Sequence, residues 1–151
     1  MIEILGMTVG HAYWQKTMQF AETCSWRAGP YLANEMRKGA FHDWERVFAA
    51  VINGEIIGFC TLMKYDELPE SYGYSPFIGF VFVREEYRGN RLSERMIEAV
   101  VEYAGSIGFE KIYLMSGEKG LYEKFGFRKI GDFPTIFNTI DQLFERTVST
   151  R

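Results

Sequence analysis

The hydrophobic pattern is clearest in the middle of the chain, where it predicts a hairpin, a buried strand and a helix in succession. Residues 46–63 hold two apolar runs joined by Asn53–Gly54, the dipeptide that favours a type I′ hairpin turn. Residues 77–83 are an unbroken apolar run, which is typical of a strand buried on both faces. From Leu92 to Ala104, a rotation of about 100° per residue places apolar side chains on one broad arc and charged ones opposite.

Weaker patterns on either side predict the remaining elements. Residues 13–27 carry apolar side chains close to helical spacing, and Gly29–Pro30 ends this pattern before a second short helix that stops at Gly39. Residues 120–127 predict one or two helical turns that end at Gly126. We expect further strands at residues 2–5, 111–115, 128–133 and 135–140.

The order of these elements sets the fold class. The strand–helix–strand segment in the middle should form a right-handed parallel crossover, whereas the hairpin before it must be antiparallel. We therefore expect an α+β fold with a mixed, mostly antiparallel central sheet flanked by helices and one parallel crossover. The 151 residues contain no repeat or linker and are enough for one core, so we expect a single domain over residues 1–151.

Composition and charge narrow the class of partner. The formal net charge of −3 and the pI of about 5.5 argue against a nucleic-acid-binding protein, which needs a basic surface. The chain starts without a signal-peptide pattern, and no apolar run approaches the length of a membrane span, so we expect a cytoplasmic protein with no membrane partner. Cys24 and Cys60 predict free thiols, and two separated histidines, His11 and His42, predict no metal site.

One stretch, Arg88 to Ser93, combines features that suit a bound phosphate; we call it the glycine turn. It follows the strand at residues 77–83 and opens the next helix, whose first amide N–H groups are unpaired and carry the positive end of the helix dipole. Gly89 removes a side chain that would keep a ligand from the backbone, and Arg88 and Arg91 can add charge-assisted hydrogen bonds. The small Ser93 lies on the apolar arc and lets the helix approach the strand. An ordinary strand-to-helix turn with solvated arginines explains the same residues.

Residues 77–127 taken together resemble the GCN5-related N-acetyltransferases, the GNAT superfamily. In that family a strand ends in R/Q-x-x-G-x-G/A, and "VREEYRGNRLSERM" fits in register: Arg88 takes the first position, Arg91 the first glycine and Ser93 the Gly/Ala. Downstream, "GLYEKFGF" resembles the family's tyrosine-bearing helix. Two positions depart from the family. Arg91 replaces a glycine, on the polar side of the helix where a long side chain should fit, and the asparagine often found after the "KIYLM"-type strand is absent.

The resemblance implies transfer of an acetyl group from acetyl-CoA, used as co-substrate, to a primary amine. The backbone of the central strand would hold the pantetheine, and an N–H near Phe82 or Val83 would polarise the thioester carbonyl. The residues implied in coenzyme A binding are Phe82, Val83, Arg88, Gly89, Asn90, Arg91, Leu92 and Ser93.

Tyr122 is the candidate general acid, because its phenol could protonate the departing thiolate. A core ring in a short amphipathic helix is the alternative explanation of this tyrosine. The base is not fixed by the sequence, since the central strand contains no acidic residue. Candidate base and substrate residues are Asp66, Glu67, Glu70 and Tyr72 in the loop before that strand, and Ser116 and Glu118 along a water chain.

Two other functions fit parts of the sequence. A catalytically idle module that binds or senses acyl-CoA would keep the glycine turn and tolerate the departures at Arg91 and at the absent asparagine. A nucleotide-binding protein would use the same helix N-terminus, but the chain lacks both GxxxxGK[ST] and GxGxxG. The pattern leaves the identity of the amine undetermined and a homodimer through the C-terminal strands open.

Overall fold

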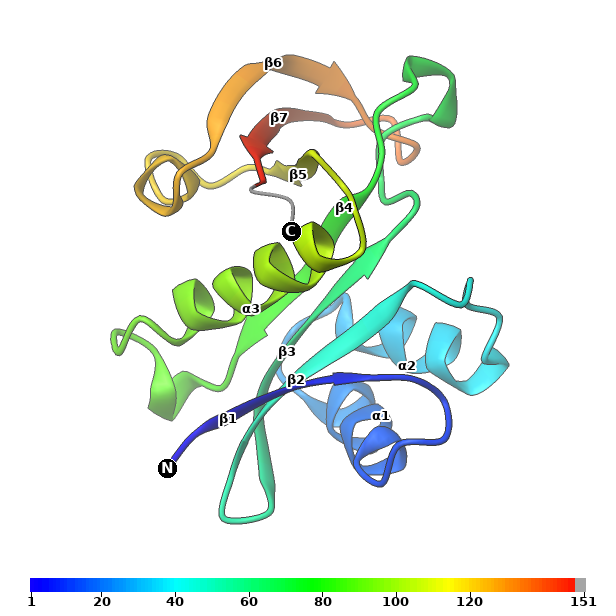
Figure 1. Cartoon of the computed structure of the whole chain (residues 1–151), viewed down its shortest axis with the longest axis vertical. Helices are drawn as coiled ribbons and strands as arrows, with labels where there is room; N and C mark the ends of the chain where they lie inside the picture. The colour runs from blue at the N-terminus through cyan, green and yellow to red at the C-terminus, as the bar shows by residue number, and fades with distance from the viewer. Residues whose placement is uncertain (149–151) are drawn as a thin grey trace. The chain divides into compact units, whose positions relative to one another are not determined.

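The structure is a computed structural model that describes residues 1–148 (Figure 1). In chain order the elements are β1 (Glu3–Met7), α1 (Trp14–Thr23), α2 (Gly29–Lys38), β2 (Arg46–Ile52), β3 (Glu55–Met63), η1 (Glu70–Tyr72), β4 (Phe77–Val83), η2 (Glu85–Tyr87), α3 (Leu92–Ser106), β5 (Lys111–Ser116), η3 (Tyr122–Phe125), β6 (Arg128–Pro134) and β7 (Ile140–Thr147), where η marks a 3₁₀ turn.

The strands form a seven-stranded mixed sheet in the order β1-β2-β3-β4-β5-β7-β6. β4 and β5 are parallel, with Phe77 opposite Tyr113, and α3 is the connection between them. The pairs β1–β2, β5–β7 and β6–β7 are antiparallel. This arrangement confirms the predicted α+β fold with one parallel crossover. β6 is an edge strand, and its pairing with β7 shifts register between Lys129 and Gly131.

The chain divides into two compact units, and each has its own core. The first unit comprises Met1–Thr61 and Phe80–Ala99, and the second comprises Leu62–Gly79 and the chain from Val100 onward. In the first unit α1 and α2 lie side by side (Figure 1), and residues such as Trp14, Leu32 and Phe59 are buried together. The apolar stripes of the two helices therefore supply much of this core.

The second unit buries a smaller cluster under the loop that precedes β4. Leu68 from this loop and Phe77 from β4 pack with Tyr113, Met115 and Leu143 of β5 and β7. Tyr113 lies opposite Glu145, and Met115 lies opposite Leu143, so these side chains share one face of the β5–β7 pair. No helix among the described residues is long and apolar enough to span a membrane.

Several local predictions are confirmed with their physical cause. Asn53 and Gly54 both have positive φ values, 49° and 79°, which is the conformation of a type I′ turn. α2 ends at Gly39, which has a φ of 65° and donates its N–H to the Glu35 carbonyl as a helix C-cap. The apolar run at residues 77–83 is β4 with the same bounds.

Two local predictions are wrong. The helix expected over residues 13–27 ends at Thr23, because Cys24 is extended and the chain then brings Trp26 against the Phe82 ring. Residues 135–139 are a turn and not a strand: the Thr135 hydroxyl accepts the Phe137 N–H at 3.1 Å, and this side-chain bond competes with strand pairing. The last strand is β7, which begins at Ile140.

The start of α2 allows a direct test of the first unit's packing. A Cβ added to Gly29 would lie 2.2 Å from the Ala21 carbonyl oxygen and 2.5 Å from the Cys24 sulfur. We expect Gly29→Ala to lower the free energy of unfolding by about 3 kcal/mol or more, because backbone must move to relieve the overlap. Urea unfolding would measure the loss. Gly10→Ala is the matched control, since nothing lies within 4 Å of its added Cβ. An equal loss in both variants would contradict this account.

Candidate functional site

The glycine turn (Arg88–Ser93) lies in the first unit, at the end of β4. The Arg84 N–H donates to the Ile57 carbonyl at 2.8 Å, η2 follows, and Gly89 then turns the chain with a φ of 84°. Nothing lies within 4 Å of the position that a Cβ of Gly89 would occupy. Glycine is thus favoured here by its left-handed conformation, and the space beside its backbone is open.

The first amides of α3 complete an anion-binding geometry. The first helical hydrogen bond runs from the Arg95 N–H to the Arg91 carbonyl at 3.1 Å. The N–H groups of Leu92, Ser93 and Glu94 therefore have no acceptor within the helix. Unpaired amides at the positive end of a helix, next to an open glycine, can bind a phosphate group.

Arg88 is directed back toward β4. Its Nε donates to the Val83 carbonyl at 2.8 Å, and its guanidinium carbon lies 5.3 Å from the centre of the Phe82 ring. The Asn90 side chain donates to the Tyr87 carbonyl at 3.4 Å. These contacts bring Phe82, Val83 and Arg88 together at the end of β4 and fix the entry to the glycine turn.

Arg91 differs from the sequence expectation in its conformation. It precedes α3 instead of lying on the polar side of that helix, and its φ of 60° is a left-handed value that favours glycine. Its side chain is 79% exposed and binds the Glu94 carboxylate at 2.6 Å, an interaction that lowers the pKa of Glu94. The long side chain is tolerated because it points into solvent, whereas the backbone keeps the glycine-like geometry.

Close approach between strand and helix occurs at Gly58 of β3. A Cβ there would lie 2.9 Å from the Phe82 carbonyl oxygen and 3.4 Å from Met96 of α3. Ser93 is half-buried, and its role as a size-selected residue stays a prediction. Sequence reasoning could have located this close contact, because a glycine inside an apolar strand is a recognised signal that another backbone approaches it.

An aromatic wall adjoins the end of β4, and the sequence analysis did not identify it. The Trp26 ring stacks on Phe82 with a centroid distance of 5.8 Å and an angle of 3°, and it meets Phe80 edge-on at 6.2 Å. Phe80 has a φ of 51°, an unusual conformation for an aromatic residue inside a strand. Ser25, next to Trp26, donates to the Glu85 carboxylate. The segment between α1 and α2 is thereby attached to the end of β4.

In the second unit, the Glu67 carboxyl is hydrogen-bonded to Asp141 and interacts electrostatically with Asp66, and we call these three residues the carboxylate trio. Burial, the hydrogen bond with Asp141 and the neighbouring carboxylates raise the pKa of Glu67 to about 8. Burial also raises the pKa of Asp66 to about 6, although a hydrogen bond with the Glu67 backbone lowers it in part. Near neutral pH, the Glu67 carboxyl therefore keeps its proton.

Asp141 was missed because it lies far along the chain from Glu67, at the start of β7. The turn after β5 brings the predicted Ser116 and Glu118 to the same place: the Gln142 side chain donates to both of their carbonyls, at 3.1 and 2.9 Å. A Cβ on Gly117 would lie 3.4 Å from an Asp141 carboxylate oxygen. The alternation of side chains between the two faces of β7 could have indicated where Asp141 points, but only if this strand had been predicted.

The remaining predicted substrate residues are less closely associated with the trio. Glu70 is exposed on η1, and its carboxylate forms no hydrogen bond or ion pair with a described residue. The Tyr72 ring packs edge-on against Phe133 at 5.2 Å. The structure therefore brings Asp66 and Glu67 together with the Ser116–Glu118 turn, whereas Glu70 faces solvent.

Tyr122 is a member of the second unit's aromatic core. Its side chain is 7% exposed, and its ring lies 5.8 Å from Phe144 and 6.2 Å from Phe127. Leu121 and Phe125, its neighbours in the turn, are only half-buried. The core-ring explanation is therefore correct for the ring, and the role of the hydroxyl as general acid stays a prediction. No group of three or more His, Cys, Asp or Glu side chains within residues 1–148 is arranged to hold a metal ion.

Comparison with known proteins agrees with this geometry. The family model described as the acetyltransferase (GNAT) family matches residues 11–127. A search of curated proteins finds no significant match.

Solved structures with the same fold include three acetyltransferases. An aminoglycoside 6′-N-acetyltransferase complexed with coenzyme A is 16% identical with a TM-score of 0.72, over 99% of this chain and 98% of its own. A GNAT family acetyltransferase from Elizabethkingia anophelis with acetyl-CoA bound is 17% identical with a TM-score of 0.67, over 97% and 98%. A spermidine N-acetyltransferase chimera from Vibrio cholerae and hSSAT is 15% identical with a TM-score of 0.68, over 97% and 95%. At these identities the similarity shows the fold.

The raised pKa of Glu67 predicts a pH-dependent stability. In the unfolded chain this carboxyl ionises near its ordinary pKa of 4.5, but in the folded chain it keeps its proton up to about pH 8. Its stabilising contribution is full below about pH 4.5 and is lost as the pH rises through 8, because the folded state binds more protons in between. We expect Glu67→Gln to gain stability relative to the wild type between pH 5 and pH 9.

Urea unfolding at several pH values would measure this gain as the difference between the variant and wild type. Glu70→Gln is the control, because its carboxylate is exposed, and it should keep the wild-type profile. A Glu67→Gln profile parallel to that of the wild type would show that Glu67 does not hold the proton.

Proposed function

This chain belongs to the acetyltransferase (GNAT) family, and from that premise we propose that it is an N-acetyltransferase that transfers an acetyl group from acetyl-CoA to a primary amine. The observation that carries the proposal is the glycine turn: an open Gly89 followed by the unpaired first amides of α3. These groups suit the pyrophosphate of coenzyme A. Two of the similar structures contain coenzyme A or acetyl-CoA, which supports the choice of ligand.

Groups of this chain fit both the phosphate end and the acyl end of that ligand. The N–H groups of Leu92, Ser93 and Glu94 would donate to the phosphates, and Arg88 would add positive charge beside them. The backbone of Phe82 and Val83 would hold the acyl end of the bound molecule, which supplies an activated thioester carbonyl. Because Arg88 also binds the Val83 carbonyl, one side chain couples the phosphate end to the acyl end.

Acyl transfer from the thioester to a protonated amine forms a C–N bond, breaks a C–S bond and removes two protons from the nitrogen. The first leaves before the attack, and the second, released when the C–N bond forms, balances the proton that the departing thiolate receives. Within the proposal, the carboxylate trio attracts the protonated amine and then accepts its proton directly or through water near Ser116 and Glu118. Asp66, whose pKa is about 6, is ionised near neutral pH and can accept this proton, since a base works best near the operating pH. Tyr122 would return a proton to the departing thiolate.

The trio also supports a preference for cationic acceptors. The Asp66 carboxylate, ionised near neutral pH, repels an anionic substrate and favours an amine that carries a second positive charge. The similar structures include enzymes named for spermidine and for aminoglycosides. Location in the cytoplasm and a homodimer stay predictions from the sequence.

The second candidate is a catalytically idle module that binds acyl-CoA. The observation that favours it is the composition of β4, which contains no acidic residue and so places no catalytic base on the strand that would hold the acyl group. Turnover with a panel of primary amines and polyamines distinguishes the two functions, since only the enzyme releases free coenzyme A thiol.

Binding of the co-substrate is the first requirement and has a direct measurement. We expect coenzyme A and acetyl-CoA to raise the melting temperature, whereas ATP and NAD leave it unchanged. A ligand at about 100 times its dissociation constant contributes roughly 2.7 kcal/mol, which for a chain of this size is a shift on the order of 5–11 °C. Differential scanning fluorimetry measures it, and no shift at millimolar coenzyme A would disprove the proposal.

The acid role of Tyr122 is tested by removing only its hydroxyl. Because the ring is part of the core, Tyr122→Phe should keep the melting temperature near that of the wild type and preserve coenzyme A binding. Turnover on an accepted amine should fall roughly 10²- to 10⁴-fold, the usual loss for a general acid. Tyr31→Phe, at an exposed position on α2, is the control. Unchanged turnover in Tyr122→Phe would assign the tyrosine to packing alone.

A further inference from the structure

The aromatic wall at the end of β4 consists of Trp26, Phe80 and Phe82, and all three residues belong to the first unit. The Trp26 ring spans the other two, because it lies 5.8 Å from the centre of the Phe82 ring and 6.2 Å from that of Phe80. Phe82 is buried, whereas Trp26 and Phe80 are half-buried. Part of each of these two side chains therefore remains accessible beside β4.

The same part of β4 is open to a ligand. β4 lies inside the sheet between β3 and β5, yet Phe80 and Val81 are half-buried while the other residues of the strand are buried. Among the described residues, the register of β4 with β5 contains only Phe77 and Ile78. No residue of β5 thus lies opposite the later part of β4, which is where the proposed function places the thioester.

The segment that carries Trp26 is fixed by its own contacts. The Gly29 N–H donates to the Trp26 carbonyl at 3.0 Å, and the Ser25 hydroxyl donates to the Glu85 carboxylate at the end of β4. The space behind the segment is filled, since a Cβ added to Gly29 would lie 2.5 Å from the Cys24 sulfur. These contacts oppose a movement of the indole away from the wall.

The separation of the rings limits what can enter the wall. Carbon atoms in contact lie about 3.5–4.0 Å apart, so an alkyl chain between two parallel rings needs about 7–8 Å between their planes. The rings of Trp26 and Phe82 are parallel to within 3°, and their centroid distance of 5.8 Å is the upper limit of the distance between the planes. No alkyl chain therefore fits between them, and a long acyl chain held on β4 meets a closed wall.

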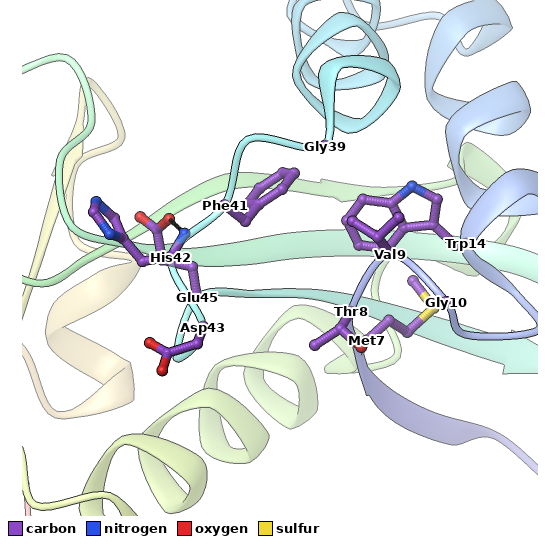
Figure 2. A pocket seen from close by; sticks show the side chains of 10 residues that line it. All are labelled: Met7, Thr8, Val9, Gly10, Trp14, Gly39, Phe41, His42, Asp43 and Glu45. Carbon is purple, nitrogen blue, oxygen red and sulfur yellow. Dashed lines mark hydrogen bonds between the residues drawn. The ribbon is translucent and has the colours of Figure 1, made fainter.

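A cavity elsewhere in the first unit does not supply room for such a chain. It has a volume of about 220 Å³ and lies between the loop after β1 and residues 39–45, with Trp14 and Phe41 beside it (Figure 2). None of the ten described residues that line this cavity belongs to β4 or to the segment between α1 and α2 that carries Trp26. The room for an acyl chain on β4 is therefore set by the aromatic wall.

We propose that Trp26 determines the acyl specificity of this protein: its indole admits an acetyl group and excludes medium-length acyl chains. The inference rests on the proposed function, because it assumes a thioester held at Phe82 and Val83, and it adds a choice of acyl group to that function. Without the indole, Phe80 and Phe82 would offer an apolar surface to a longer chain. Burial of each methylene group there is worth about a fourfold gain in affinity.

Isothermal titration calorimetry of the full chain with coenzyme A and with hexanoyl-CoA tests the proposal, since it needs neither an acceptor amine nor turnover. The wild type should bind hexanoyl-CoA no more tightly than coenzyme A. Trp26→Ala should bind hexanoyl-CoA at least roughly tenfold more tightly than coenzyme A, which corresponds to the burial of about two methylene groups. Tyr31→Ala, at an exposed aromatic position on α2 of the same unit, is the matched control and should keep the wild-type ratio.

A second variant and a second readout keep the test independent of stability. Trp26 packs against the core, so the melting temperature of each variant shows whether it is folded. Trp26→Leu keeps a smaller apolar side chain and should shift the binding ratio in the same direction by roughly fourfold. On an accepted amine, the ratio of kcat/KM for hexanoyl-CoA to that for acetyl-CoA should rise at least roughly tenfold in Trp26→Ala, and a uniform loss of activity does not alter this ratio.

Two results would overturn the role of Trp26 alone. Wild-type protein that binds hexanoyl-CoA roughly tenfold more tightly than coenzyme A would show that the wall is open to longer chains. Unchanged ratios in both Trp26→Ala and Trp26→Leu would show that the indole does not limit the acyl group. Both results require intact binding of coenzyme A and leave the proposed function standing, whereas absence of coenzyme A binding in the wild type would overturn both proposals.

Discussion

The parallel pairing of β4 with β5 is the constraint from which the candidate site follows. Parallel neighbours cannot be joined by a short turn, so the chain needs a crossover, and here α3 supplies it. The first amides of α3 must then lie where β4 ends, and the turn between them must reverse the chain within a few residues. Gly89, with its left-handed backbone, makes that reversal. An anion-binding geometry is thus a by-product of sheet topology that a coenzyme can use.

The two units contribute different chemistry. The first carries positive dipole ends, Arg88 and an aromatic wall, all of which suit a polyanion with a long flexible arm. The second carries the carboxylate trio and Tyr122, which suit proton transfer and the binding of a cation. Under the proposed function, the groups for the phosphates and the groups for the amine belong to different units. Substitutions that alter one preference need not disturb the packing that supports the other.

Local signals in the sequence were sufficient for the hairpin, β4, α3 and the glycine turn, because each depends on residues within one short segment. The approach of Asp141 to Glu67 could not be predicted, since it depends on β7, and the sequence analysis placed the last strand too early, at residues 135–140. In β7 the charged and polar side chains weaken strand propensity, and pairing with both β5 and β6 overrides it. The stacking of Trp26 on Phe82 was hidden for a similar reason: it requires α1 to end early, and only tertiary contacts of an aromatic ring make that favourable.

The edge strand β6 affects how copies of this chain can meet. Its irregular register near Gly131 interrupts the regular row of backbone groups that another strand would need. Arg128, Lys129 and Asp132 place exposed charges along it, and Pro134 removes one N–H donor. Extension of the sheet from one molecule into the next is thereby opposed at this edge, which protects the chain from open-ended aggregation in a crowded solution.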